Sequence, residues 1–181
     1  SAAESGCIGL NIGVESGNEQ MLKISKKPGS INTFKKAAKV LRKYEQINTR
    51  VFLMIGFPDE TYRMILDTLN LAIEMDLDWY NITIFQPLPN TSMFDYMVQR
   101  GLLDQVAFEN IRYSSGAYGK IHQNVNKGQL DANVNKIFEN RNLDTSPTES
   151  QLYDIWFFMN YYLNFKRLYK ENRPDKLKQQ L

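Results

Sequence analysis

Cysteine and histidine are nearly absent from this chain, which holds one of each among 181 residues. A single cysteine forms no internal disulfide and builds no cysteine-ligated metal site by itself. Basic and acidic residues nearly balance, at 22 and 20, so no broad positive field favours nucleic acid as a partner. No aliphatic run approaches the roughly 20 residues of a membrane helix, and the first residues lack the basic and apolar regions of a signal peptide. These absences favour a cytoplasmic protein without nucleic-acid or membrane partners.

Strand and helix patterns alternate along the first part of the chain. The predicted strands lie at 7–14, 49–57 and 79–85, and the predicted helices at 32–46, 61–76 and 92–100. Strands that alternate with helices indicate βα units and a parallel sheet, so the expected fold class is α/β. A parallel sheet normally has both faces covered, and three strands rarely suffice for that. We therefore expect this sheet to be part of a larger one.

The composition changes after the third strand–helix unit, which divides the expected domains into 1–104 and 105–181. Residues 105–146 are rich in asparagine, glycine and serine, with weak periodicity. We expect an irregular segment there, with short helices around 106–112 and 130–139. The lone histidine falls in this segment and is expected to be a surface or packing residue.

A long aromatic-rich helix is predicted at 147–170. The stretch "SPTE" at 146–149 offers a serine cap, a proline at the first helical position and a glutamate three residues after the cap. An interaction or membrane-surface helix would have a basic polar face, and basic residues gather only near 166–178. We therefore favour a helix that packs on the main domain or on an absent part of the chain.

The first predicted strand ends in a carboxylate. Ligands of parallel βα sheets bind beyond the carboxyl ends of the strands, where Glu15 and Ser16 stand. By strand alternation we expect Asn11, Asn81 and Thr83 on one polar face, which suggests a lined cavity rather than a dry core. A structural role for the glutamate, capping the following turn or helix, stays open.

The other two predicted strands end in turn-forming residues. "IGFPDET" at 55–61 has a glycine, Gly56, that permits close backbone approach, a proline that stiffens the turn, and Asp59 or Thr61 as a helix cap. "QPLPNTSMF" at 86–94 has two prolines around a turn that starts a helix. Either stretch alone is ordinary loop chemistry, but three such strand ends in this order are uncommon.

Three stretches together resemble a known family. They are "GLNIGVESGNEQMLKISKK", "FLMIGFPDET" and "PLPNTSMFD". In this order they resemble the second half of radical S-adenosylmethionine (SAM) enzymes, which typically show G-x-E-S-G, L-K-x-x-x-K, G-x-P-x-E-T and P-x-P-G-T. The most similar group often carries a cobalamin-binding domain upstream. The resemblance covers residues 4 to about 104. Asn90 replaces the usual glycine of the last motif, and asparagine tolerates the positive φ that the turn needs.

The resemblance implies that the three strands are the second half of a (β/α)6 partial TIM-like barrel. The family's CxxxCxxC loop, which holds a 4Fe–4S cluster, is absent from this sequence. We therefore expect a fragment of a larger enzyme whose full-length form uses SAM and the cluster, with the missing N-terminal half of the chain as partner. The fragment would be inactive alone. The resemblance names no substrate and no reaction.

The resemblance also implies a set of residues that hold SAM. Glu15 and Ser16 would contact ribose, Lys26 or Lys23 the SAM carboxylate, Leu53, Ile55 and Gly56 the adenine ring, and the backbone of Gln86, Pro87 and Leu88 the adenine edge. For the lysines a solvated surface role stays open, and for Glu60 and Thr61 we favour helix capping. No acid–base catalyst and no metal ligand is expected, and Cys7, near the start of its strand, is expected in the core.

Two alternatives stay open at this point. One is a non-catalytic binding or scaffold module with a degenerate half-barrel, and the other is a (β/α) enzyme of another kind with Glu15 as base. In either case the edge of the first strand would lack a neighbour, because the preceding strand is absent. Unpaired strand edges recruit other strands, so we expect the fragment to dimerise through that edge or to be poorly soluble.

Overall fold

A computed structural model describes residues 2–102 and 137–166 of the chain. The chain divides into two compact units, the first made of Ser1–Phe85 and Ala132–Leu181 and the second of Gln86–Asp131. The helix predicted at 106–112 and the lone histidine, His122, lie outside the described residues.

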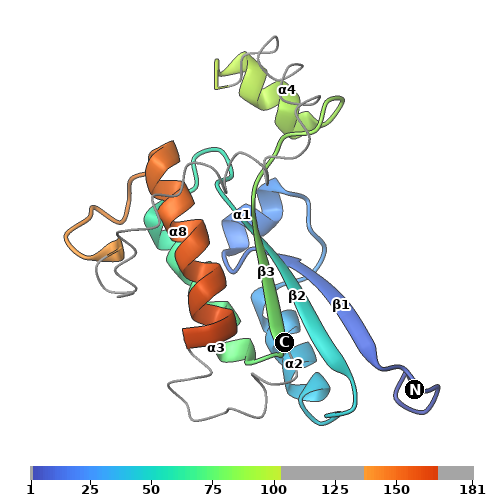
Figure 1. The fold of residues 1–181 in the computed structure, drawn as a ribbon. Coiled ribbons are helices and arrows are strands. Elements are labelled where there is room, and N and C mark those ends of the chain that lie inside the picture. The colour runs from blue at the N-terminus through green and yellow to red at the C-terminus, as the bar shows by residue number, and fades with distance from the viewer. Residues whose placement is uncertain (1, 103–136, 167–181) are drawn as a thin grey trace, which may run out of the picture. The chain divides into compact units, whose positions relative to one another are not determined.

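The first unit is built on a parallel sheet of three strands in the order β1-β2-β3 (Figure 1). The strands are β1 (Gly9–Glu15), β2 (Asn48–Ile55) and β3 (Trp79–Ile84), and the helices that connect them are α1 (Glu19–Ile24), α2 (Ile31–Leu41) and α3 (Tyr62–Met75). The parallel α/β fold predicted from the periodicity is confirmed. Helix α1 is an additional short helix, capped by the side chain of Asn18.

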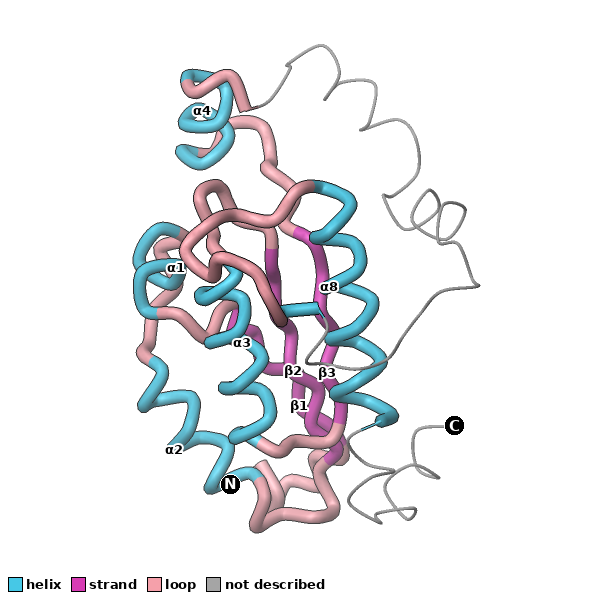
Figure 2. Tube along the Cα trace, turned by 90° about the vertical axis from the view of Figure 1, so that its left-hand side faces the viewer, coloured by secondary structure: helices cyan, strands magenta, loops and turns pink. Residues whose placement is uncertain are grey.

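One face of the sheet is closed by helices. Helices α1, α2 and α3 lie on one side of the sheet, and α8 (Glu149–Tyr161) lies along β3 (Figure 2). Alternate side chains of β2 point into this core, namely Val51, Leu53 and Ile55, each at most 1% exposed. Burial of such a side chain stabilises the fold by about 1.5–3 kcal/mol. The core therefore fixes which face of each strand is left for other contacts.

The opposite face of the sheet carries the polar side chains that the alternation predicted. The strand register pairs Asn11 with Arg50, Asn81 with Phe52 and Thr83 with Met54. Because the β2 members of these pairs alternate with the core residues, all three polar residues share the face opposite the helices. The predicted common polar face is confirmed.

Helix α8 and the π-helical turn that follows it cover the outer edge of β3. Asn164 accepts a hydrogen bond from the Tyr80 N–H at 2.8 Å and donates one to the Tyr80 carbonyl at 2.7 Å. Asn160 makes the same pair of bonds to Ile82, at 3.3 and 3.1 Å. Two side-chain amides, one helical turn apart, thus replace a neighbouring strand. The expectation that this helix packs on the main domain is confirmed.

The start of this helix differs from the prediction. The cap is Thr148 rather than Ser146, because Thr148 and Gln151 form a reciprocal capping box two residues further on. The helix continues beyond Tyr161 as a π-helical turn, Tyr162–Lys166. Positions 167–170 of the predicted helix lie outside the described residues. No helix in the described part of the chain has both the length and the apolar character to cross a bilayer.

The edge of β1 that lies away from β2 has no such cover among the described residues, unlike the outer edge of β3. Asn48 donates its N–H to the carbonyl of Ile8 at 2.9 Å, so alternate residues of β1 direct their backbone groups to β2. The remaining ones, Gly9, Asn11 and Gly13, direct theirs to the other side. The described residues contain no strand on that side of β1.

The second unit contains helix α4 (Ser92–Gln99), which begins after the cap residue Thr91. Asn90, at the position where the resembled motif has glycine, has a φ of +66°. The expectation that asparagine supports this left-handed turn is confirmed.

Candidate functional site

The carboxyl end of β1 is irregular. Gly13 pairs with Phe52 and Glu15 with Leu53, so Val14 is an extra residue on β1 and forms a bulge. Glu15 has a φ of +70°, which costs about 1–3 kcal/mol for a residue with a side chain. Bulges often redirect a side chain beside a functional site. The strain at Glu15 therefore marks this strand end as the first place to look for a ligand.

Glu15 forms an ion pair at this position. Its Oε1 lies 3.1 Å from the Nζ of Lys27, and the two side chains are 21% and 26% exposed. A Cβ added to Gly13 would lie 2.7 Å from the Glu15 Oε1 and 3.0 Å from the Lys27 Nζ. Gly13 thus leaves the space that the ion pair fills. The two charged groups are partly open to solvent and offer an acceptor and a cation side by side.

The lysine in this pair is the one that sequence reasoning missed. The sequence predicts Lys26 or Lys23 for the SAM carboxylate, and the structure places both on the exposed surface. Lys26 has a φ of +54°, and this left-handed residue turns the chain so that Lys27 faces Glu15. The lysine doublet was the only signal, and it does not say which member faces the strand end. The SAM contact predicted for Lys26 is untested, and Lys27 is the competing candidate for that contact.

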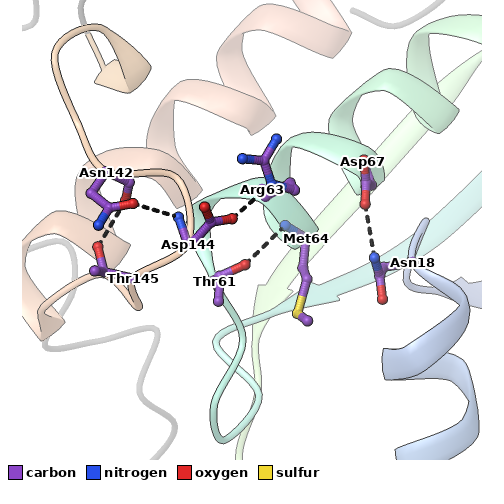
Figure 3. Close-up of polar contacts among 8 residues, drawn as sticks. All are labelled: Asn18, Thr61, Arg63, Met64, Asp67, Asn142, Asp144 and Thr145. Carbon is purple, nitrogen blue, oxygen red and sulfur yellow. Dashed lines mark hydrogen bonds and ion pairs between the residues drawn. The ribbon is translucent and has the colours of Figure 1, made fainter.

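The residues that follow Glu15 bind α3. Ser16 is fully buried, and its hydroxyl lies 3.2 Å from the hydroxyl of Thr68. Gly17 donates its N–H to the Thr68 hydroxyl at 2.9 Å. Asn18 donates its amide to Asp67 at 2.8 Å (Figure 3). A Cβ on Gly17 would lie 2.5 Å from the Asp67 carbonyl oxygen. The S-G-N part of the motif therefore fastens the loop to α3, and the ribose contact predicted for Ser16 stays a prediction.

The carboxyl end of β2 holds a second glutamate, in a buried setting. One carboxyl oxygen of Glu60 accepts hydrogen bonds from the backbone N–H groups of Gly56 and Phe57. The other oxygen is buried with no hydrogen-bond partner among the described residues. Removal from water raises the pKa of Glu60 to about 8, against the smaller opposing effect of the two N–H donors. Glu60 thus holds the turn after β2, whereas the helix cap that we favoured for Glu60 and Thr61 is Thr61 alone.

The residues predicted to contact adenine at this strand end belong to the core. Leu53 and Ile55 are at most 1% exposed and point to the helix-covered face. Gly56, at φ +84°, has Leu152 of α8 in the space of its missing side chain, 2.5 Å from an added Cβ. The adenine contacts of these three residues stay predictions. The accessible face at this level carries Met54, which the motif comparison did not single out.

The turn after β2 leads directly into α3. Thr61 caps α3 by accepting the N–H of Met64 at 3.4 Å, as predicted (Figure 3). On the neighbouring strand end, Phe85 donates its N–H to the Ile55 carbonyl at 2.8 Å. The ring of Phe85 lies 4.8 Å from that of Phe57. Hydrogen bonding and ring packing thus join the ends of β2 and β3.

The third predicted contact region belongs to the second unit. It comprises Gln86, Pro87 and Leu88, and its backbone contacts to adenine stay predictions.

The described residues contain no group of three histidine, cysteine, aspartate or glutamate side chains that could hold a metal ion. Cys7 lies before β1, at the end opposite the glutamates, and its thiol donates to the Gly9 carbonyl at 3.3 Å. The carboxyl edge of the sheet offers charged groups for polar recognition. The Glu15–Lys27 pair suits a ligand that presents hydroxyl groups and a carboxylate.

Comparison with known proteins adds family and relatives to this geometry. Residues 1–72 match the model of the radical SAM superfamily. A Pyrococcus horikoshii protein named as an uncharacterized methyltransferase is 30% identical over 100 residues, which cover 55% of this chain and 22% of the relative. A tRNA-2-methylthio-N(6)-dimethylallyladenosine synthase of Vibrio cholerae is 33% identical over 88 residues, which cover 48% and 19%. The Aliivibrio fischeri enzyme of the same name is 32% identical over 88 residues, with the same coverage.

The chain spans about a fifth of the length of the curated relatives it matches. The family match includes β1, β2 and most of α3, and with them both glutamate-bearing strand ends. The part of the chain that is similar to the radical SAM superfamily is therefore residues 1–72.

Proposed function

We propose that this chain supplies one side of the SAM-binding site of a radical SAM enzyme. The observation that carries the proposal is the Glu15–Lys27 pair at the strained, bulged carboxyl end of β1, inside the segment that matches the superfamily. Glu15 would accept hydrogen bonds from the ribose hydroxyls. Lys27 would leave Glu15 to pair with the carboxylate of the methionine part, a charge-assisted contact of the stronger kind.

The fold supports a half-site rather than a whole one. We propose that the three parallel strands are the second half of a six-stranded partial barrel. The edge of β1 that pairs with no strand among the described residues would then face a strand from the remainder of the protein. The iron–sulfur cluster does not fit this chain's own donors, because its three thiolate ligands exceed the single cysteine present. Bound together, cluster and SAM supply one-electron chemistry, and this chain's share is to bind and orient SAM.

Candidate reactions of the whole protein come from the names of the relatives rather than from this site. The names of the relatives state methyl and methylthio transfer for those proteins. We propose either as a candidate reaction class, since these are the groups that the names of the relatives state. A cobalamin-binding domain upstream stays a prediction of the motif resemblance.

Binding of SAM to the natural full-length protein, with its cluster reconstituted under anaerobic conditions, tests the proposal. Calorimetry on Glu15→Ala is expected to show Kd raised about tenfold, a loss of about 1.4 kcal/mol. The matched control is Glu45→Ala, which removes an exposed glutamate from the loop before β2. Equal Kd values for Glu15→Ala and the unsubstituted protein would contradict the assignment and favour another kind of (β/α) enzyme.

A further inference from the structure

The turn that follows β2 is held in place by a segment about 80 positions later in the sequence. This segment, Arg141–Leu152, is here called the C-terminal clamp, and it precedes and begins helix α8. It lies outside the residues that match the superfamily. Its contacts concentrate on two places, the first turn of α3 and the space beside Gly56.

The clamp supplies the backbone acceptors for the first turn of α3. A helix leaves its first N–H groups without intrahelical partners. Here Tyr62 donates its N–H to the Thr145 carbonyl at 3.0 Å, and Arg63 donates to the Leu143 carbonyl at 2.9 Å. Figure 3 shows the loop around Asn142 and Thr145 lying against this end of the helix. The point where the β2 turn enters α3 is therefore set partly by the clamp.

A buried tyrosine connects the same two parts. Tyr62 is 3% exposed and donates its hydroxyl to Gln151 at 2.7 Å. Arg141 donates to the same hydroxyl at 3.1 Å, with its guanidinium 5.2 Å from the ring centre. The buried Tyr62 hydroxyl thus contacts both Gln151 and Arg141 of the clamp, and removing it would take a hydrogen-bond partner from each of these side chains.

Leu152 completes the set of contacts. It fills the side-chain space of Gly56, and an added Cβ there would lie 2.5 Å from a Leu152 methyl group and 3.4 Å from Ile84. On the inside of the turn, the Glu60 carboxyl holds the Gly56 and Phe57 N–H groups. The turn is thus held by its own glutamate on one side and by α8 on the other.

We infer that the C-terminal clamp is a positioning element of the proposed SAM site, fixing the Gly56–Thr61 turn at the carboxyl edge of the sheet. The inference rests on the proposed function. Ligand recognition depends on placement to within about an ångström, so a contact far from the ligand in sequence controls affinity when it sets the backbone of the site. Substitutions in the clamp should then change SAM binding out of proportion to their effect on stability.

Two leucines of the C-terminal helical segment make a matched test in the full-length, cluster-reconstituted protein. Leu152→Ala removes the contact with Gly56, whereas Leu163→Ala removes a fully buried leucine near the other end of β3. Because Leu163 is the more buried, its variant should lose more thermal stability. Leu152→Ala should raise the Kd for SAM about fivefold, and Leu163→Ala less than about twofold, since only the first loosens the turn.

Rescue by a side chain of similar volume separates positioning from general damage. Leu152→Met keeps the space beside Gly56 filled and should restore the Kd to within about twofold of the unsubstituted protein. Circular dichroism and the thermal midpoint establish that each variant is folded before binding is measured.

A second pair of variants keeps the inference testable if Leu152→Ala does not fold. Tyr62→Phe removes only the hydroxyl that joins α3 to the clamp, and it should raise the Kd for SAM about threefold, since a buried partner is lost. Tyr153→Phe is the control, because that hydroxyl contacts Glu149 on the exposed side of α8.

The outcomes distinguish a failure of the positioning inference from a failure of the proposed function. If the unsubstituted protein binds SAM and Leu152→Ala and Tyr62→Phe bind it equally well, the positioning inference is overturned while the proposed function stands. If the unsubstituted protein does not bind SAM at all, the proposed function is overturned. A larger loss of affinity in Leu163→Ala than in Leu152→Ala would also overturn the positioning role, because affinity would then follow overall stability.

Discussion

The carboxyl ends of β1 and β2 each hold a glutamate, and the two glutamates are used in opposite ways. Glu15 is partly exposed, sits on a strained bulge and pairs with Lys27. Glu60 is buried, bonds backbone N–H groups of its own turn and has a pKa raised to about 8. Neighbouring strands thus provide one carboxylate available to a ligand and one that shapes the protein. Residue type at a strand end does not separate these roles, whereas burial and partner do.

The comparison makes Glu60 the more important residue for stability. Glu60→Ala leaves the N–H groups of Gly56 and Phe57 without their acceptor and opens a small cavity, so we expect a loss of about 2–4 kcal/mol in the free energy of unfolding. Urea unfolding followed by circular dichroism measures this. Glu60→Gln keeps an acceptor for both N–H groups and should lose less. A Glu60→Ala variant as stable as the unsubstituted protein would show that the carboxyl does not hold the turn.

The same residue predicts how stability depends on pH. The folded pKa of Glu60 is about 8 and its ordinary value is 4.5, so between these values the folded state binds more protons than the unfolded state. The contribution of the neutral Glu60 carboxyl to the free energy of unfolding is therefore fully present below about pH 4.5. It is lost as pH rises through about 8, by at most about 1.4 kcal/mol per pH unit.

The control for this pH dependence is Glu60→Gln, which does not titrate. Its stability should fall less than that of the unsubstituted protein between pH 5 and pH 8. Burial is the largest cause of the raised Glu60 pKa, and the two backbone N–H donors oppose it. Parallel pH profiles for the two proteins would contradict the buried, neutral carboxyl.

Gly13 offers a way to disturb only the exposed glutamate. The new Cβ of Gly13→Ala would meet the ends of the Glu15 and Lys27 side chains, which are flexible and can move aside. We expect a loss of stability of about 1 kcal/mol or less together with weaker SAM binding. Thermal unfolding and calorimetry on the same sample measure both, and unchanged SAM binding would argue that the ion pair is not where the ligand sits.

The smallest stability effect is expected at Glu15 itself. An ion pair that is partly exposed contributes about 1 kcal/mol or less, so Glu15→Gln should change the free energy of unfolding by no more than that. Urea unfolding checks the value. If Glu15→Gln destabilised the protein as much as Glu60→Ala, the contrast between the two strand ends would be lost.

Much of the fold was predictable because it depends on local patterns. Alternating apolar residues marked the strands, and residue type narrowed the cap of α3 to Asp59 or Thr61, of which the structure uses Thr61. The Glu15 position followed from the same pattern, since a carboxylate directly after an aliphatic strand stands out. Thr148 was missed as the helix cap in favour of Ser146, because both residue types cap helices and the choice depends on the chain's path.

The contacts that could not be predicted join residues far apart in the sequence. Lys27 reaches Glu15 only because Lys26 adopts a left-handed conformation, which no composition rule signals for lysine. Asn160 and Asn164 bind the edge of β3 across about 80 positions, and a local reading sees only polar residues on an aromatic helix. Ser16 is fully buried with its hydroxyl 3.2 Å from that of Thr68, a contact across 52 positions that strand alternation does not predict.

Two adjacent lysines provide the most direct measurement of the central claim. The Kd for SAM should rise about tenfold in Lys27→Ala of the full-length, cluster-reconstituted protein, and it should stay within about twofold in Lys26→Ala, because only Lys27 lies beside Glu15. The two variants remove the same charge from neighbouring positions, so a general electrostatic effect would affect both. Equal Kd values for the two variants, or a larger loss in Lys26→Ala, would contradict a ligand site at the Glu15–Lys27 pair.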